Sequence, residues 1–173
     1  MKKAVLLALY MTVITLICGS ILFYMNDLTT PLILSQIEKE QKSALTKVMP
    51  KATEFTLQAD NLYQGLNKDK QLCGYVFKVT PIGYGGEISM LVGISNGIVT
   101  GISILSLSET PGLGAKANEA SFQQQFIAKS IEDAFVAKKD VQAITGSTVT
   151  SQAVADGIKT AITNYKKITE TKE

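Results

Sequence analysis

The sequence contains no arginine, no histidine and no tryptophan, and all 17 basic residues of its 173 are lysine. Without histidine the chain cannot form a Ser-His-Asp or Cys-His catalytic group, nor a zinc or haem site with imidazole ligands. The lack of arginine removes the bidentate group favoured for phosphate and guanine recognition. With 15 acidic residues the net charge is only +2, so we expect no nucleic-acid partner.

Cysteine is also scarce, because only Cys18 and Cys73 are present. Cys18 lies in a long hydrophobic run and Cys73 in a separate apolar stretch, so we expect no disulfide between them. Iron-sulfur clusters normally need four thiolates, which this chain cannot supply. Any redox role must therefore use another cofactor.

The most prominent positive feature is the uncharged hydrophobic run from Ala4 to Met25. A helix of this length spans about 33 Å, which exceeds a hydrocarbon core of about 30 Å. The alternative is a cleaved signal peptide, but its apolar region is usually about 7 to 15 residues long and ends in small residues. We therefore predict an uncleaved, single-pass membrane helix. Lys2 and Lys3 precede it, which places the N-terminus in the cytoplasm and the following domain outside the membrane.

The chain is predicted to divide into three parts. Residues 1–25 form the cytoplasmic N-terminus and membrane helix, residues 26–52 a connecting helix, and residues 53–173 a single domain. Thr30-Pro31 offers an N-cap and a first-turn proline for the connecting helix, and Met49-Pro50 ends it.

The domain itself is predicted to be α+β, a twisted antiparallel sheet with flanking helices. Alternating and apolar runs predict strands, Asn96-Gly97 predicts a type I′ hairpin turn, and helical spacing predicts a short and a long helix. The expected strands are 54–57, 72–79, 87–95, 98–107 and 141–144, and the expected helices are 118–129 and 150–167.

Three loops have compositions that a hydrophobic core does not require. In Pro81–Gly86, glycines allow the backbone to approach a flat ligand and Tyr84 can stack or hydrogen-bond. In Glu109–Gly114, proline and glycines leave amides open and Glu109 can accept from a ring NH. Taken alone, each loop is more often an ordinary turn, and the second lacks the Lys-Ser/Thr ending of a P-loop.

The third loop, Thr145–Thr148, is expected between a strand and the last helix. Unpaired amides and the helix dipole at such a point favour a phosphate. The alternative is a plain N-cap made by Ser147 or Thr148.

Together the motifs GYGGEISMLVGISNGIVTGISILSLSETPGLG and VQAITGSTVTSQAV resemble the FMN-binding domain of the G subunit of the Rnf complex, the ion-translocating ferredoxin:NAD oxidoreductase. The resemblance covers essentially the whole chain. The family's flavin-attachment pattern is Asp-x-x-Ser/Thr-Gly-Ala-Thr, and its last threonine falls on Thr148. Gln142 stands where the family usually has Asp, and Ser147 where it usually has Ala.

The resemblance implies that a flavin transferase joins FMN to Thr148 through a phosphoester. Tyr84 and Gly85 of the first loop are implied to bind the cofactor. The other implied contacts are Glu109, Thr110, Gly112, Leu113 and Gly114 near the isoalloxazine ring, and Thr145, Gly146 and Ser147 near the phosphate.

The implied role is an electron relay in a complex that couples ferredoxin oxidation and NAD reduction to Na⁺ or H⁺ transport. Its partners would be the other Rnf subunits, especially the membrane-embedded D subunit. The subunit would belong to a translocase without supplying a catalytic acid or base. Two alternatives are the C subunit of the Na⁺-translocating NADH:quinone reductase and an extracytoplasmic scaffold without a cofactor.

Overall fold

The computed structural model describes residues 2–170, which divide into one unit ending at Glu40 and another beginning at Gln41. The first unit is helical throughout, because helix α1 (Lys2–Val48) continues through it into the second. Within α1, Leu9–Thr30 is long and apolar enough to cross a membrane, with a mean hydropathy of 1.6. The expected N-terminal apolar helix is therefore confirmed.

The predicted helix start at Thr30-Pro31 is wrong, because α1 is continuous there. A proline removes one backbone hydrogen bond from a helix interior. The Thr30 hydroxyl donates to the Asn26 carbonyl oxygen at 2.6 Å, so it bonds within the helix instead of capping a new one. The division of the chain at residues 25 and 52 remains a prediction.

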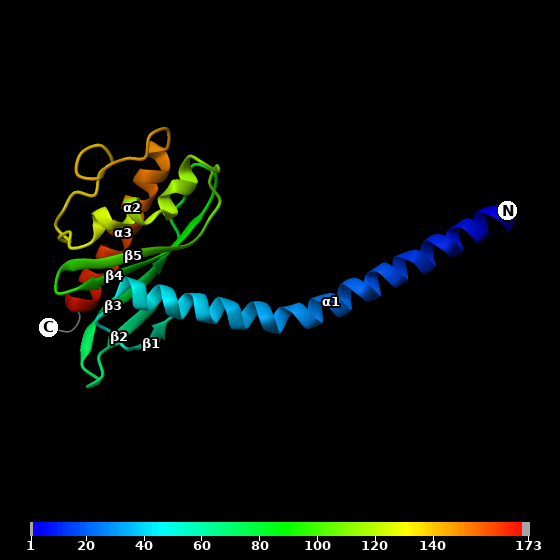
Figure 1. The fold of residues 1–173 in the computed structure, drawn as a ribbon, viewed down its shortest axis with the longest axis horizontal. Coiled ribbons are helices and arrows are strands. Elements are labelled where there is room, and N and C mark those ends of the chain that lie inside the picture. The colour runs from blue at the N-terminus through cyan, green and yellow to red at the C-terminus, as the bar shows by residue number, and fades with distance from the viewer. Residues whose placement is uncertain (1, 171–173) are drawn as a thin grey trace. The chain divides into compact units, whose positions relative to one another are not determined.

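The second unit is built on a five-stranded antiparallel sheet whose strands lie in chain order (Figure 1). This confirms the predicted fold class. The strands are β1 (Glu54–Ala59), β2 (Leu62–Leu66), β3 (Leu72–Val79), β4 (Ile88–Ser95) and β5 (Ile98–Leu107). Asn96 and Gly97 between β4 and β5 have φ of 50° and 74°, the positive values that the predicted type I′ turn needs. Strand β2 was not predicted, because its short sequence contains Gln64 and Gly65.

One face of the sheet is covered by helix α3 (Thr148–Glu170), which packs on β3 and β4. Val154, Ile158 and Ala161 of α3 are fully buried in the main hydrophobic core. The predicted amphipathic helix is thus present, but it begins two residues before the expected Thr150.

The opposite face of the sheet receives the C-terminal end of α1. Val48 and Met49 are buried there against Val76 and Leu91. The Thr100 hydroxyl of β5 donates to the Val48 carbonyl oxygen at 2.8 Å, which satisfies one of the carbonyls left open at the helix end.

Paired glycines make room for this helix end. Gly93 of β4 faces Gly101 of β5, and a Cβ on Gly101 would lie 2.9 Å from the Val48 carbonyl oxygen. Gly65 of β2 faces Gly74 of β3, and a Cβ on either would lie within 2.8 Å of the Met49 side chain. We call these four residues the glycine cradle, and it seats the helix end directly on the sheet.

The predicted helix 118–129 is wrong, because three short elements replace it. They are the 3₁₀ helix η1 (Gly114–Asn118), α2 (Ala120–Gln123) and the 3₁₀ helix η2 (Gln124–Phe126). The spacing of Phe122 and Phe126 did indicate burial, since both rings are buried and meet edge to face at 5.4 Å. Their backbone changes from α to tighter 3₁₀ turns, which a spacing of apolar residues does not reveal.

The predicted strand 141–144 is also wrong, because only an isolated bridge joins Val141 to Ala137. The next residue shows why no ladder extends. The Gln142 amide donates to Gln125 Oε1 at 2.7 Å, and Gln125 Nε2 donates to the Gln142 carbonyl oxygen at 3.2 Å. A side chain therefore takes both backbone groups that a neighbouring strand would need.

Candidate functional site

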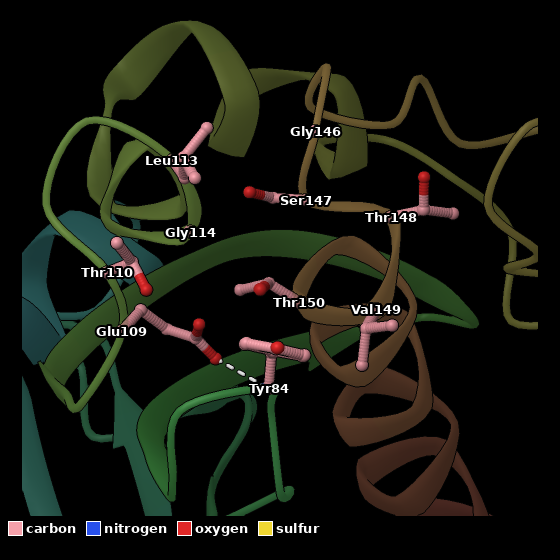
Figure 2. A pocket seen from close by; sticks show the side chains of 10 residues that line it. All are labelled: Tyr84, Glu109, Thr110, Leu113, Gly114, Gly146, Ser147, Thr148, Val149 and Thr150. Carbon is pink, nitrogen blue, oxygen red and sulfur yellow. Dashed lines mark hydrogen bonds between the residues drawn. The ribbon is translucent and has the colours of Figure 1, made fainter.

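The three loops singled out in the sequence meet around one cavity of about 470 Å³ (Figure 2). That size lies within the usual range of small-molecule and cofactor sites, about 300 to 1,000 Å³. Most of the predicted site residues line it. The lining residues are Tyr84, Glu109, Thr110, Leu113, Gly114, Gly146, Ser147, Thr148, Val149 and Thr150.

Glu109 joins the first two loops. Its Oε1 accepts a hydrogen bond from the Tyr84 amide at 2.8 Å, which Figure 2 marks with a dashed line. A Cβ on Gly83 would overlap this same oxygen, so the close approach of the loops requires a glycine there. Gly85 does not line the cavity, because it is pressed against the Ser108 carbonyl oxygen. Its role is to seat the Tyr84 loop on the end of β5.

Gly114 keeps the floor of the cavity open. A Cβ at this buried position would lie 2.5 Å from Glu109 Oε2 and 2.9 Å from Thr150 Oγ1. The carboxylate and this hydroxyl therefore lie beside the same glycine, on elements far apart in sequence. Gly112 does not line the cavity, but its φ of 77° suits the turn that leads to Gly114.

The third loop, Thr145–Thr148, is fixed to the start of α3 by Ser151, which is fully buried. The Ser151 hydroxyl accepts from the Ile144 amide at 3.0 Å and donates to the Ser147 carbonyl oxygen at 2.9 Å. Gly146 completes the turn with a φ of 79°. These bonds, and not a preceding strand, position the first residue of the helix, Thr148.

Thr148 is half-buried and borders the cavity. Within residues 2–170, neither its hydroxyl nor that of Ser147 makes a hydrogen bond, so the simple N-cap alternative does not occur here. The first amides of α3 have no carbonyl four residues earlier in the helix to bond. Thr145 lies apart and lines a second cavity of about 280 Å³ with Gln142 and Lys116.

Two lining residues, Val149 and Thr150, were not predicted. The helix was expected to begin at Thr150, which placed this residue in a regular first turn instead of in a binding site. Because α3 begins at Thr148, the Thr150 side chain turns back toward the cavity floor. The sequence did offer one signal for Thr150, because it is a hydroxyl residue two positions after Thr148, the predicted attachment site.

Asp140 stabilises the loop that leads to this turn. Its carboxylate accepts from the amides of Val136 and Phe135, at 2.7 and 2.8 Å, and lies 3.3 Å from Lys129 Nζ. Burial alone would raise the pKa of Asp140, but the two amides and Lys129 outweigh it and lower the pKa below its ordinary value.

Asp140→Asn is expected to destabilise the domain by about 1 to 2 kcal/mol at neutral pH, because the amide side chain loses the charge-assisted bonds. A lowered folded-state pKa contributes stability above the unfolded pKa and loses it as the pH falls through the folded value. Variant and parent should therefore converge in acid. Thermal unfolding from neutral pH to strongly acidic pH measures this difference. Asp60→Asn, at an exposed turn, is the control, and a difference that persists in acid would contradict the assignment.

The fold is that of an FMN-binding domain. The family model described as FMN-binding domain matches residues 83–163, which contain every residue lining the cavity. The crystal structure of Shewanella oneidensis NqrC has the same fold, with a TM-score of 0.51, 14% identity, and coverage of 66% of this chain and 67% of that one.

Proteins named as G subunits match nearly the whole chain. The G subunit of the Na⁺-translocating ferredoxin:NAD⁺ oxidoreductase complex of Acetobacterium woodii is 33% identical over 192 residues, which cover 95% of this chain and 92% of that protein. The G subunit of the proton-translocating complex of Clostridium ljungdahlii is 33% identical over 159 residues, covering 88% and 86%. The chain belongs to this family, the G subunits of Rnf-type ion-translocating oxidoreductase complexes.

The residues present fit FMN. The cavity has room for a ring system, and glycines at positions 83 and 114 keep its walls open where a Cβ would collide with Glu109. Unbonded hydroxyls and the first amides of α3 offer partners for a phosphate and for polar ring atoms. The cavity thus combines apolar and polar surfaces in the way a flavin requires.

Proposed function

We propose that this chain carries FMN joined to Thr148 through a phosphoester, and that the flavin lies in the cavity bordered by the three loops. The observation that carries the proposal is the position of Thr148, a half-buried threonine with an unbonded hydroxyl at the mouth of that cavity. The start of α3 favours the negative charge of the phosphate through its amides and dipole. A covalent ester also explains why no arginine is needed to hold the phosphate.

The bound flavin supplies the electron-carrying chemistry, as a cofactor usually does. The chain's own residues hold and orient it. Gly114 lets the ring approach the backbone, Glu109 keeps the two glycine loops together, and Tyr84 stands at the exposed rim. No side chain of this site needs to act as acid, base or nucleophile during electron transfer.

We further propose that the domain relays electrons between redox centres of an Rnf-type complex, outside the membrane, while the N-terminus lies in the cytoplasm. The membrane-embedded D subunit and neighbouring redox subunits are the proposed partners, and a flavin transferase loads Thr148 from FAD. Support comes from the apolar segment Leu9–Thr30, from Lys2 and Lys3 before it, and from the names of the relatives. Those names include both a Na⁺- and a proton-translocating complex.

The mass of the peptide containing Thr148 tests the attachment. The full chain is produced in membranes with and without an active flavin transferase, digested and analysed by mass spectrometry. We expect the peptide to gain the mass of FMN less one water only when the transferase is present. An unmodified peptide beside an active transferase would favour the cofactor-free scaffold. Purification with a ferredoxin-like B subunit would separate an Rnf complex from a Na⁺-translocating NADH:quinone reductase, whose C subunit shares the fold.

Glu109→Gln is expected to favour the reduced flavin. The glutamine oxygen can still accept from the Tyr84 amide, while the negative charge that opposes added electrons disappears. The ratio of reduced to oxidised flavin should rise about tenfold at a fixed ambient potential, or ~1.4 kcal/mol. Spectroscopic titration against a redox dye measures it. Glu119→Gln, at an exposed residue outside this cavity, is the matched control, and an unchanged ratio in Glu109→Gln would place the carboxylate away from the ring.

A further inference from the structure

Two largely buried residues of the cavity have hydroxyl groups without a protein partner. Ser147 is 7% exposed and Thr150 is 1% exposed, and within residues 2–170 neither hydroxyl makes a hydrogen bond to the protein. Among those residues only Gln123 Oε1 is a fully buried side-chain polar atom without a partner, so the two hydroxyl oxygens remain accessible from the cavity. Polar groups at such a site are normally hydrogen-bonded to protein, water or ligand, and a molecule bound in the cavity can take this place.

The side chains of Ser147 and Thr150 extend toward the same loop (Figure 2). Figure 2 shows the Ser147 and Thr150 side chains directed toward the loop that carries Glu109 and Gly114, while the Thr148 side chain points away from it. Thr150 Oγ1 and Glu109 Oε2 both lie beside Gly114, where a Cβ would approach them to 2.9 and 2.5 Å. The cavity lining thus combines two hydroxyl groups with one carboxylate oxygen, and the Thr150 hydroxyl and the carboxylate oxygen meet beside Gly114.

This set of groups selects a particular chemistry. A carboxylate can only accept a hydrogen bond when ionised, whereas a hydroxyl can donate one. A matching ligand edge therefore presents an NH group next to carbonyl or ring-nitrogen acceptors. In a flavin, the pyrimidine edge of the isoalloxazine has this pattern, whereas the dimethylbenzene edge has no polar atom.

We propose that Ser147 and Thr150 donate hydrogen bonds to the pyrimidine edge of the flavin, while Glu109 Oε2 accepts from its ring NH. The inference rests on the proposed attachment at Thr148 and adds the orientation of the ring. The dimethylbenzene edge then lies toward the exposed side of the cavity, where Tyr84 is 77% exposed. Ser147, which replaces the alanine of the family's pattern, gives this chain a contact that an alanine cannot make.

The hydroxyls also influence the redox equilibrium. Reduction adds electron density to the ring nitrogens and carbonyl oxygens, so a donor at those atoms binds the reduced ring more tightly than the oxidised ring. Removing one such bond should shift the equilibrium toward the oxidised flavin. A neutral hydrogen bond of about 0.5 to 1.5 kcal/mol corresponds to a shift of roughly two- to tenfold.

The test uses the full flavinylated chain in detergent with the variants Ser147→Ala and Thr150→Val. Thr163→Val is the matched control, because Thr163 is an exposed threonine of the same helix, outside the cavity. All three variants keep Thr148, so their bands should remain fluorescent on a denaturing gel. This fluorescence reports only whether flavin is attached at Thr148. A failure of the proposed attachment can therefore be told apart from a failure of the proposed ring orientation.

The second readout is the ratio of oxidised to reduced flavin against a redox dye, together with the visible absorption spectrum. We expect Ser147→Ala and Thr150→Val each to favour the oxidised flavin two- to tenfold and to shift the spectrum, while Thr163→Val matches the parent. A parental ratio and spectrum in Ser147→Ala would overturn the contact of that residue. Ser147→Thr keeps a hydroxyl on the same Cβ, so this variant should show the parental ratio of oxidised to reduced flavin. If Thr150→Val does not fold, Thr150→Ser, which keeps the hydroxyl, should show the parental ratio. The Ser147→Ala variant then still tests whether a hydroxyl of this site bonds to the ring.

A third readout tests the orientation. Thr148→Val chain that lacks covalent flavin is titrated with lumiflavin and with its N3-methyl derivative, and quenching of ligand fluorescence reports binding. The methyl group blocks the ring NH, so the derivative should bind at least several-fold more weakly. Equal binding of the two compounds, or equal lumiflavin binding by Thr148→Val and by the Thr148→Val, Ser147→Ala double variant, would show that the pyrimidine edge does not occupy the floor.

Discussion

Thr148→Val is expected to abolish the covalent flavin completely. A phosphoester needs a hydroxyl oxygen, and valine replaces that oxygen with a methyl group of nearly the same shape. Folding should change by about 1 kcal/mol or less, because Thr148 is half-buried and its hydroxyl makes no hydrogen bond in the described part of the chain. Denaturing gel electrophoresis under ultraviolet light, after co-expression with a flavin transferase, measures the loss directly.

Two control variants make this result specific. Thr148→Ser keeps a hydroxyl on the same Cβ and should retain flavin, with a lower yield because serine has more rotational freedom than β-branched threonine. Ser147→Ala should also retain flavin, since the Ser147 side chain is 7% exposed and points into the cavity. A fluorescent band in Thr148→Val that disappears in the Thr148→Val, Ser147→Ala double variant would move the attachment to Ser147.

Gly101→Val is expected to cause the largest loss of stability, about 3 kcal/mol or more. Its Cβ would lie 2.9 Å from the Val48 carbonyl oxygen and 3.2 Å from the Val48 Cα. Both are backbone atoms, so no rotation of a side chain relieves the overlap. The helix end must lift from the sheet, which also breaks the bond from the Thr100 hydroxyl to Val48.

Thermal unfolding of the full chain in detergent, followed by flavin fluorescence, measures this effect. Ser106→Val is the control, because Ser106 lies in the same strand at an exposed position where valine has a favourable β-propensity. We expect a markedly lower midpoint for Gly101→Val and an unchanged one for Ser106→Val. Equal midpoints would mean that the helix end does not depend on the glycine cradle.

Local sequence patterns predicted the parts of the fold that depend on local rules. The alternation in 87–95 and the Asn96-Gly97 turn predicted β4, β5 and their hairpin, because side-chain period and positive φ are properties of a few neighbouring residues. Strand β2 was missed because its Gly65 matters only through Met49, a contact from another element. The predicted strand 141–144 failed for the same reason, since a distant Gln125 side chain takes the hydrogen bonds of Gln142.

The loops of the site were found from composition, but their connections were not. Tyr84 and Glu109 were selected separately, and only the structure shows the amide of one bonded to the carboxylate of the other. Ser151 looked like an ordinary helix residue, although its hydroxyl holds the turn before Thr148. Such bonds depend on the exact start of α3, which spacing placed two residues too late.

The glycine cradle also determines how the domain resists a pulling force from its tether. β1 follows α1 in the chain and is an edge strand, so tension applied directly to β1 would peel it from β2 one hydrogen bond after another. Instead, tension along the chain at residue 41 first meets Val48 and Met49, which are seated on glycines of β2, β3, β4 and β5. We therefore expect the load to be shared among four strands, with less of it on the β1 edge.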